Sequence, residues 1–477
     1  MFFCRHDRHE MASMVYNWDS DEVDAVVVTD GSRVLGLGDL GIGGLGISIG
    51  KLDLYVAAGG FHPKRVLPCV IDVGTNNVKL KNDPMYLGDR EDRLEGEEYY
   101  SLIDEFMAAI KLRWPRALIQ FEDFQSKHAV KLLARYKREY LMFNDDIQGT
   151  ASTVLAGLYG AMKVRGEETS ALKDQVIVVA GAGSAGSGVL LTIRNALHRR
   201  HGLTLEAANR RFYIVDDRGL ISKGRDNLEE MEEQFYDLSS FAARDHTMEG
   251  LSLLETIRRV RPTILIGLSA CGGLFTEEIL RAMTESHPDA QPIIFPLSNP
   301  TSRSECTAEQ AQAATGGRAI FASGSPFPDV VMDGTTIASS QCNNRYIFPG
   351  LALGAALGQT GVVTNAMINK SAEALVELLS EADLTRRATF PENVDIRGIA
   401  AHLAARVFEQ AVEENLKISN KVRMVGVVFV VLIVTMRQVM LEAYDKGGME
   451  GLKQYIYSKM WYPHYRPLVY QHPGKGE

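Results

Sequence analysis

Short apolar runs alternate with helix-length segments along most of this chain, and this alternation constrains its fold more than any other feature. The runs with strand character lie at 25–30, 66–74, 117–124, 141–146, 176–180, 213–217, 263–270, 292–300 and 319–326. Strands that alternate with helices of this length form βαβ units, in which neighbouring strands are parallel. We therefore expect an α/β protein built on parallel sheets.

The composition and charge of the chain exclude several classes of protein. Apolar residues make up 45% and charged residues 23%, which is ordinary for a folded protein and unlike a disordered or fibrous chain. Acidic residues outnumber basic ones by 60 to 51, and the formal charge of −9 argues against a nucleic-acid-binding protein. The five cysteines form no CxxC pair, so we expect a reducing compartment and neither a disulfide scaffold nor a zinc ribbon.

One uncharged segment, Met424 to Met436, has a membrane-like composition. Its 13 residues would span only ~20 Å as a helix, against ~30 Å of bilayer hydrocarbon. We therefore interpret it as a buried strand or core helix, and we expect no membrane partner. The N-terminus carries Asp7 and Glu10 and resembles neither a secretory signal nor a transit peptide.

Two segments match the GxGxxG pattern of dinucleotide-binding turns. The match with Gly181, Gly183 and Gly186 follows an apolar strand, opens into a helix, and is followed by another strand that ends in Asp216. In that layout backbone N–H groups hold a pyrophosphate and the acidic residue accepts the ribose hydroxyls. The interval to Asp216 exceeds the usual ~20 residues, which an insertion between the two strands would explain.

The other match, 36–41, is followed by more glycines and has no clear helix start. We interpret it as a loop that lies against a substrate. The expected division is then a first domain at 1–147, a Rossmann-type dinucleotide-binding domain at 148–420, and a C-terminal segment at 421–477.

Paired carboxylates mark two successive strand ends in the first domain. Glu122 and Asp123 end one apolar run, and Asp145 and Asp146 end the next. Adjacent parallel strands would bring the pairs together, and such crowded carboxylates need a cation. Oxygen donors without His or Cys favour Mg²⁺ or Mn²⁺. Any single Asp is more simply a helix cap, but four acids at two matched junctions favour a metal site.

Four other polar residues are ambiguous when they are taken one at a time. Lys51 and Arg33 flank the first glycine loop, where each is most simply a surface charge. Asn299 and Asn344 lie at the ends of apolar runs, where asparagine is typical of turns.

As a set, these features resemble the malic enzyme family, in the family's order. The segments that carry the resemblance are DGSRVLGLGDLGIGGLGISIGKLDLYVAAGG, LPCVIDVGTNN, QFEDF, FNDDIQGT, GAGSAG, LSNPT, ECTAEQA, FASGSPF, NNRYIFPG and WYPHYRPLVY. The resemblance implies oxidative decarboxylation of L-malate to pyruvate and CO₂, with NAD or NADP and with Mg²⁺ or Mn²⁺. It also implies a homodimer or homotetramer, in the cytoplasm or the mitochondrial matrix.

The resemblance also assigns roles to single residues. Glu122, Asp123 and Asp146 match the metal ligands, Lys51 matches the general base, and Asp145 matches a carboxylate that assists it. Arg33 matches the residue that holds the malate carboxylate. Asn299 and Asn344 match contacts to the substrate, and Asn299 also matches a contact to the nicotinamide. Gly181, Gly183, Gly186 and Asp216 match the cofactor fingerprint.

Two questions stay open at this point. The family has a helical region with a tyrosine acid in a YTP-type motif, which this sequence lacks, so we expect a chain that begins after that region. The alternative to an enzyme is therefore a non-catalytic, nucleotide-binding or oligomer-forming relative. The choice between NAD and NADP is also open, because Asp216 would accept ribose hydroxyls whereas Arg218 would meet a 2′-phosphate.

Overall fold

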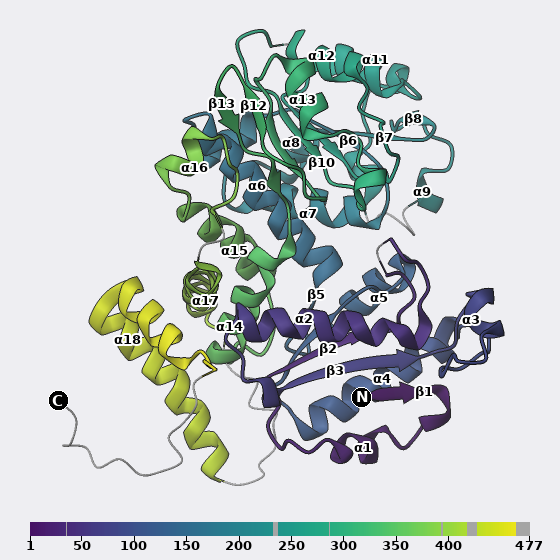
Figure 1. The fold of residues 1–477 in the computed structure, drawn as a ribbon, viewed down its shortest axis with the longest axis vertical. Coiled ribbons are helices and arrows are strands. Elements are labelled where there is room, and N and C mark those ends of the chain that lie inside the picture. Colours follow the sequence, from purple (N-terminus) through teal and green to yellow (C-terminus); the bar gives the residue numbers. More distant parts are fainter. Residues whose placement is uncertain (35, 232–236, 286, 393–394, 417–426, 464–477) are drawn as a thin grey trace.

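The computed structural model describes residues 1–34, 36–231, 237–285, 287–392, 395–416 and 427–463. In this part of the chain two large sheets lie one above the other in Figure 1, each surrounded by helices. The first sheet has five strands and the second has seven. The α/β architecture with parallel sheets is confirmed.

The first sheet has the strand order β1-β3-β2-β4-β5, and all neighbouring pairs are parallel. Its strands are β1 (Phe2–Cys4), β2 (Ala25–Thr29), β3 (Val66–Asp72), β4 (Leu118–Phe121) and β5 (Met142–Asn144). Its helices are α1 (Met11–Met14), α2 (Leu45–Ala57), α3 (Val78–Asn82), α4 (Gly96–Arg113) and α5 (Ser126–Tyr136). Strands β4 and β5 end three and two residues before the ends of the apolar runs that predicted them. The acidic pairs therefore lie just beyond the strands.

Both faces of the first sheet are covered, which explains why β2 reads as a continuous apolar run. Val26 and Val28 belong to a core formed with α1, α4 and α5, whereas Ala25 and Val27 face α2. A strand buried on both faces has no polar alternation. Strand β1, which was not predicted, forms one edge of the sheet and pairs in parallel with β3.

The second sheet has the order β14-β11-β10-β9-β6-β7-β8, parallel except for β8. Its strands are β6 (Ile177–Ala180), β7 (Phe212–Asp216), β8 (Gly219–Leu220), β9 (Ile264–Gly267), β10 (Ile293–Pro296), β11 (Ile320–Ser323) and β14 (Ser340–Gln341). Helices α6 (Thr150–Val164) and α7 (Ser184–Arg199) share a core with one face. Helices α11 (Leu253–Val260), α12 (Glu277–Glu285) and α13 (Ala308–Thr315) cover the other. This doubly wound arrangement is the Rossmann-type domain that was predicted.

Smaller elements fill the connections of the second sheet. They are the helices α8 (Leu205–Asn209), α9 (Leu228–Met231), α10 (Leu238–Phe241) and α16 (Glu381–Thr385), and the antiparallel hairpin β12 (Val330–Met332) and β13 (Thr335–Ile337). Helix α8 lies within the interval that makes the spacing from Gly183 to Asp216 unusually long.

Helices from the last third of the described chain connect the two sheets. They are α14 (Phe348–Gly358), α15 (Asn365–Glu377), α17 (Ile396–Glu413) and α18 (Val427–Lys459). An added Cβ at Gly350 would lie 2.6 Å from the Cβ of Leu403, so α14 and α17 approach as closely as glycine allows. In the same first turn of α14, the ring of Phe348 packs 5.3 Å from the ring of Tyr55 on α2. Helix α14 thus contacts both domains.

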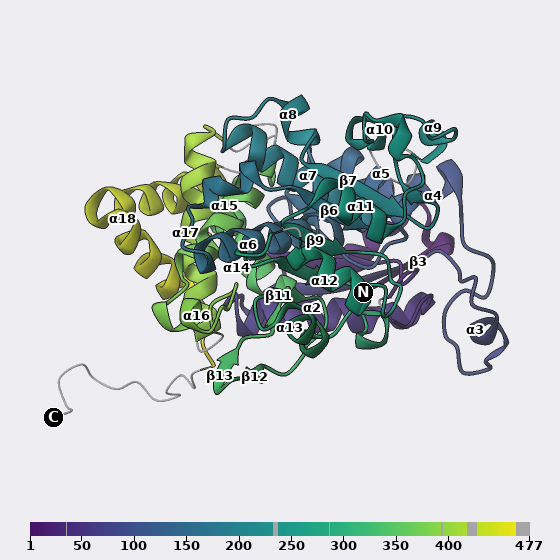
Figure 2. The ribbon, with the colours of Figure 1, turned by 90° about the horizontal axis from the view of Figure 1, so that it is seen from above.

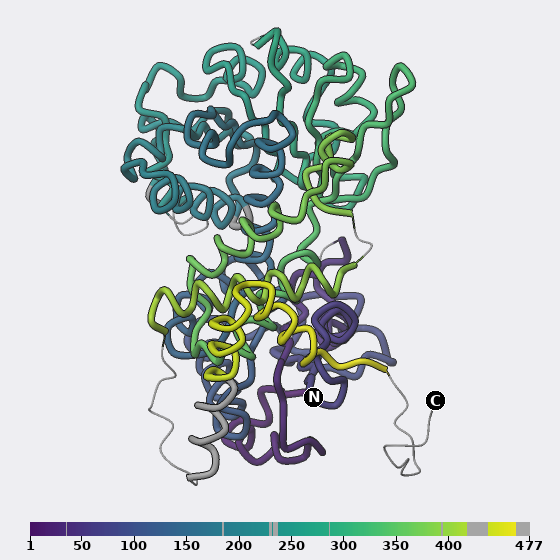
Figure 3. Tube along the Cα trace, turned by 90° about the vertical axis from the view of Figure 1, so that its left-hand side faces the viewer, coloured from purple at the N-terminus to yellow at the C-terminus, as the bar shows by residue number. Residues whose placement is uncertain are grey.

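Helix α18 is kinked at Gly448 and runs beside α17 (Figure 3). Seen from above, α18 and α3 lie at opposite ends of the molecule (Figure 2). Met440, Leu452 and Ile456 on α18 join the core that also contains α17. Of the apolar segment predicted to be a strand or a core helix, residues 427–436 are helical and 424–426 lie outside the described residues. Within the described residues, no helix is both long and apolar enough to cross a membrane.

Candidate active site

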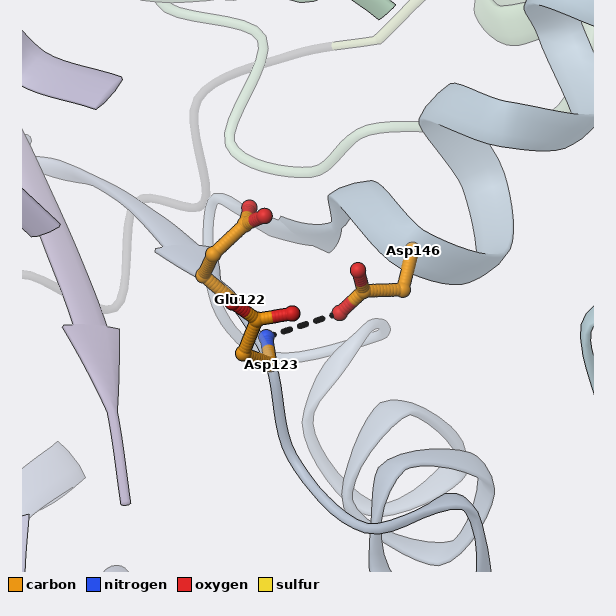
Figure 4. Close-up of side chains that lie close together, drawn as sticks. All are labelled: Glu122, Asp123 and Asp146. Atoms are coloured by element: carbon orange, nitrogen blue, oxygen red, sulfur yellow. Dashed lines mark hydrogen bonds between the residues drawn. The ribbon is translucent and has the colours of Figure 1, made fainter. Parts of the chain in front are cut away.

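Three carboxylates meet at the ends of β4 and β5. Glu122 and Asp123 follow β4, and Asp146 lies in the turn that follows β5. Oxygen atoms from the three side chains lie within 4.8 Å of one another, around a common space in Figure 4. The backbone N–H of Asp123, whose φ is +55°, donates a 2.8 Å hydrogen bond to Oδ2 of Asp146. The neighbouring parallel strands therefore bring acids from both pairs together, as expected.

The proximity of these acids makes their full ionisation unfavourable. Burial, opposed by Lys51 and assisted by Asp146, raises the pKa of Glu122 to about 8. Burial and the charge of a neighbouring cluster carboxylate raise the pKa values of Asp123 and Asp146 to about 7. A buried set of oxygen donors with excess negative charge fits a hard divalent cation such as Mg²⁺ or Mn²⁺.

Lys51 projects from α2 to the edge of this cluster. Its Nζ lies 2.5 Å from Oδ2 of Asp145 and 3.0 Å from Oε1 of Glu122. The ammonium also lies 4.9 Å from the centre of the Phe348 ring, and one fifth of the side chain is exposed. Burial favours a lower pKa for Lys51, but the two carboxylates outweigh it and hold the pKa above its usual value.

Asp145 is fully buried and is fixed by residues from both domains. Nδ2 of Asn344 donates to its Oδ2 at 3.1 Å and to its backbone carbonyl at 3.2 Å. Its other carboxylate oxygen has no hydrogen-bond partner among the described residues. An added Cβ at Gly149 would lie 1.9 Å from that oxygen, so glycine is required for the carboxylate to fit there.

A second set of buried groups supports the charged residues. Nε2 of Gln120 donates to Oε2 of Glu122 at 2.8 Å, and the hydroxyl of Tyr55 donates to Oε1 of the Gln120 side chain. A polar residue inside the apolar run of β4 is the only sequence signal that points to this contact. Tyr55 lies one helical turn after Lys51, where it reads as an ordinary core residue.

The cluster lines a cavity of about 310 Å³ whose walls come from both domains. Lys51 and Arg33 lie in the wall from the first domain, and Asn299 and Asn344 lie in the wall from the second. Arg33 is exposed, and its guanidinium donates to the Ser126 hydroxyl. Its backbone N–H donates to the backbone carbonyl of Asp123 at 3.1 Å. The structure thus gathers the predicted substrate residues around one space.

The glycine turn after β6 has the geometry of a phosphate-binding site. Gly181 has a φ of +118°, and an added Cβ would lie 2.5 Å from the carbonyl oxygen of Leu268. Gly183 is the N-cap of the 16-residue helix α7, and an added Cβ there would meet nothing within 4 Å. Gly186 is buried in the first turn of that helix. The open space before a helix N-terminus fits the pyrophosphate of a dinucleotide.

Asp216 lies at the end of β7, but its carboxylate already has a partner. The buried guanidinium of Arg225 donates to Oδ2 at 2.9 Å and to Oδ1 at 3.3 Å. The same arginine pairs with Glu249. Arg218 is half exposed and pairs with Asp226 at 3.1 Å. The ion pair between Asp216 and Arg225 was not predicted, because nothing in the sequence distinguishes Arg225 from a surface arginine.

The glycine-rich segment 36–41 does not form a second dinucleotide site of this kind. Its Asp39 accepts hydrogen bonds from Nε of Arg93 at 2.9 Å and from Nη2 at 2.6 Å, which fixes the loop to the first domain. An added Cβ at Gly36 would lie 3.8 Å from Pro300, so the loop faces the second domain near Asn299. This position agrees with a loop that lies against a substrate.

An acidic metal cluster on one sheet edge and a dinucleotide turn on another, with a shared cavity between, define a metal-dependent oxidoreductase. The chain matches the family model of the malic enzyme N-terminal domain over residues 1–137 and that of the malic enzyme NAD-binding domain over residues 147–412. It therefore belongs to the malic enzyme family.

Two relatives represent both nucleotide specificities. The chain is 46% identical over 475 residues to the NAD-dependent malic enzyme 1, mitochondrial, of Arabidopsis thaliana, covering 99% of this chain and 74% of the relative. It is 44% identical over 418 residues to the NADP-dependent malic enzyme, mitochondrial, of Mus musculus, covering 87% and 67%. The structure of the Entamoeba histolytica malic enzyme is similar in fold, with a TM-score of 0.64, 24% identity, and coverage of 95% of this chain and 84% of that one.

Proposed function

We propose that this chain catalyses the oxidative decarboxylation of L-malate to pyruvate and CO₂, with reduction of NAD or NADP and with a divalent metal ion. One observation carries the proposal: Lys51 lies between Asp145 and Glu122 beside a three-carboxylate cluster, in a cavity that the dinucleotide domain completes. The family membership and the names of the relatives support the same activity.

Glu122, Asp123 and Asp146 are the proposed metal ligands. Their oxygens lie close enough to share one ion, and the raised pKa values of all three show that the site has more negative charge than the protein alone stabilises. A divalent ion bound there would act as a Lewis acid that polarises the C2 oxygen, which is a hydroxyl in malate and a keto oxygen once C2 is oxidised.

Lys51 is the proposed general base that accepts the proton of the malate C2 hydroxyl. A neutral amine is needed for this, whereas the carboxylates of Asp145 and Glu122 favour the ammonium form. Once a cation offsets these carboxylates, burial dominates and lowers the pKa of Lys51 towards the working pH. Asp145 then holds the amine in place, since Asn344 and Gly149 fix its own carboxylate.

Arg33, Asn299 and Asn344 are the proposed substrate-binding residues. Arg33 offers a planar guanidinium that suits a carboxylate of malate, and it lies in the cavity wall beside Ser126. Asn299 lies where the dinucleotide domain faces the first domain, so it would also contact the nicotinamide side of the cofactor.

Gly181, Gly183, Gly186 and Asp216 are the proposed cofactor-binding residues. The nucleotide bound at the turn after β6 would accept the hydride from C2 of malate. We propose that the nucleotide is either NAD or NADP. The ion pair between Arg225 and Asp216 lessens the repulsion that the Asp216 carboxylate would exert on a 2′-phosphate, and relatives of both specificities match this chain.

We further propose that residues 1–147 form the metal and substrate domain, that 148–420 form the dinucleotide domain, and that 421–477 are a C-terminal segment packed through α18. A homodimer or homotetramer is proposed from the family resemblance. The names of the plant and mouse relatives include the word mitochondrial, which favours the mitochondrial matrix over the cytoplasm for this chain.

The test is the stoichiometry of the reaction with L-malate and Mn²⁺, measured with NAD and with NADP in parallel. We expect pyruvate, CO₂ and reduced nucleotide in equal amounts with at least one nucleotide. Reduced nucleotide without CO₂ would instead indicate a simple malate dehydrogenase. Binding of Mn²⁺ and nucleotide without any product would favour the non-catalytic alternative.

A further inference from the structure

The carboxylate of Glu305 is buried at the carboxyl edge of the second sheet. Glu305 lies between the 3₁₀ turn Thr301–Arg303 and α13, and none of its surface is exposed. An added Cβ at Gly267, the last residue of β9, would lie 2.4 Å from its carboxyl carbon, so glycine makes room for the group. Glu305 is not one of the proposed catalytic, metal-binding or substrate-binding residues.

Among the described residues, the four hydrogen bonds that this carboxylate accepts come from two loops. In the loop after β9, the N–H and the hydroxyl of Ser269 donate to Oε1 at 2.9 and 2.8 Å. In the loop after β10, the hydroxyl of Ser298 donates to Oε1 at 2.5 Å and its N–H donates to Oε2 at 3.3 Å. The carboxylate therefore joins two segments that are not adjacent in sequence.

The neighbouring backbone fixes the direction of both serine hydroxyls. The N–H of Ala270 donates to the Ser298 hydroxyl at 2.8 Å, and the N–H of Cys271 donates to the Ser269 hydroxyl at 3.1 Å. Each hydroxyl oxygen thus accepts from the backbone, so its one proton is left for Glu305. The two carboxylate oxygens accept all four of these donors, whereas an amide would place its NH₂ group against the Ser298 N–H that Oε2 accepts.

The two loops form the cofactor side of the active-site cavity. Leu268 lies in its wall from the loop after β9, and Leu297 and Asn299 lie in its wall from the loop after β10. The carbonyl of Leu268 also packs against Gly181 of the dinucleotide turn. Ala270 has a left-handed φ of +56°, which a residue with a side chain adopts only where its surroundings hold it.

We propose that Glu305 is a positioning residue for the nicotinamide cofactor, and this proposal rests on the proposed function. Its carboxylate keeps the loops after β9 and β10 in register, so that Leu268, Leu297 and Asn299 form one surface beside the dinucleotide turn. Glu305 itself does not line the cavity and acts only through these loops. The first domain, with the metal cluster and Lys51, does not depend on it.

The test is the Glu305→Gln variant, which keeps the size of the side chain but replaces one acceptor oxygen by a donor. We expect weaker binding of the reduced nucleotide, measured by its fluorescence, and a kcat about 10–100-fold lower, since small misplacement of reactants costs this much. The kinetic isotope effect on kcat with malate deuterated at C2 should rise, because hydride transfer becomes more rate-limiting. Mn²⁺ affinity should be unchanged.

The matched control is Asp383→Asn. Asp383 is also a buried carboxylate that accepts from the N–H and the hydroxyl of one serine, Ser380, but it caps the helix α16 and does not line the cavity. This variant should lose stability without a change in nucleotide affinity or isotope effect. If Glu305→Gln does not fold, Ser298→Ala removes one hydroxyl donor and should give a smaller change in the same direction.

The proposal is overturned if the nucleotide affinity and isotope effect of Glu305→Gln, or of Ser298→Ala where the first does not fold, match those of the unmodified chain. It is also overturned if Asp383→Asn shifts both quantities equally. Failure of the proposed function is a separate result, because the unmodified chain would then bind nucleotide without oxidising malate.

Discussion

The two parallel sheets use their carboxyl edges in different ways. At the edge of the first sheet, the active groups are charged side chains: oxygens of Glu122, Asp123 and Asp146 lie within 4.8 Å of one another, and Lys51 pairs with Glu122 at 3.0 Å. At the edge of the second sheet the backbone defines the site, since Gly181 needs a left-handed φ and the N-terminus of α7 faces open space. The first edge concentrates charge, whereas the second presents neutral backbone donors.

This difference determines what each site needs from its surroundings. At the first edge the ionised forms of the three carboxylates are unfavourable, because burial and mutual repulsion raise their pKa values. It therefore gains free energy when a cation binds. The turn at the second edge is preorganised by its backbone, so it needs shape rather than compensating charge. Substitutions at the first edge should change protonation and metal affinity, and those at the second should change nucleotide affinity.

The largest expected effect comes from removal of the proposed base. Lys51→Ala should lower kcat by about 10²–10⁴-fold, the usual contribution of positioned acid–base catalysis. Nucleotide affinity should not change, since the second edge is intact, and Mn²⁺ affinity should not fall, since a competing positive charge is removed. Steady-state malate oxidation and Mn²⁺ titration provide the measurement, with the exposed Lys64→Ala as control. A kcat within about threefold of the unmodified chain would mean that another group is the base.

The next effect concerns the metal site. Asp146→Asn should weaken Mn²⁺ binding by at least about tenfold, because loss of even an outer contact to a metal costs that much. Excess Mn²⁺ should partly restore turnover.

A control for this variant lies in the same sheet. Asp72→Asn changes a buried acid at the end of β3 whose carboxylate accepts from the N–H groups of Gly74 and Asp89. It should lower stability and leave Mn²⁺ affinity alone. Equal Mn²⁺ affinities for Asp146→Asn and the unmodified chain would contradict the ligand assignment.

A third variant tests the second edge. Gly183→Val should raise the KM for the nucleotide by at least about tenfold, equivalent to ~1.4 kcal/mol of binding, because a side chain would fill the space for the pyrophosphate. The fold should tolerate it, since an added Cβ meets nothing within 4 Å. Gly38→Val in the other glycine loop should chiefly disturb malate kinetics. The reverse pattern would mean that the two loops have been assigned the wrong way round.

A pH-dependent stabilisation by Mn²⁺ tests the first edge without any substitution. Carboxylates titrate near pH 4 in the unfolded chain but at about 7 to 8 in this cluster. Between these values the folded state binds more protons, so the free energy of unfolding falls as the pH rises through the window. Mn²⁺ requires the ionised acids, so its stabilisation should grow over the same range.

Thermal unfolding with and without Mn²⁺ measures this effect. At about pH 8, Mn²⁺ at 100 times the Kd that it has at this pH should add about 2.7 kcal/mol of stability, and the same Mn²⁺ concentration at about pH 5 should add much less. Equal shifts at both pH values would show that the cluster is not where Mn²⁺ binds.

The fold was largely predictable because most of the long strands in both sheets have a local signal in the sequence. Strands buried on both faces appear as continuous apolar runs, and the acidic pairs directly follow two of them. Strand β1 escaped prediction because it is three residues long and gains its place only by pairing with β3. For residues 427–436 the sequence left strand and helix open, since a short apolar run does not distinguish them.

The site was predictable only in part, since its second layer of contacts has no pattern in the sequence. Asn344 and Asp145 lie 199 positions apart, and no spacing rule connects them. Arg225 and Glu305 look like surface residues in the sequence, yet both are buried against specific partners. Partners of this kind become visible only when the chain is folded.

The most direct test of the division between the two edges is a single titration of malate oxidation with Mn²⁺ at saturating nucleotide. We expect no reduction of NAD or NADP in the presence of a chelator, and a rate that rises with Mn²⁺ to half its maximum at the Kd measured for Mn²⁺ binding. Nucleotide should still bind in the chelator, because the second edge needs no metal. A rate that is independent of Mn²⁺, or nucleotide binding that is lost with the metal, would contradict this account.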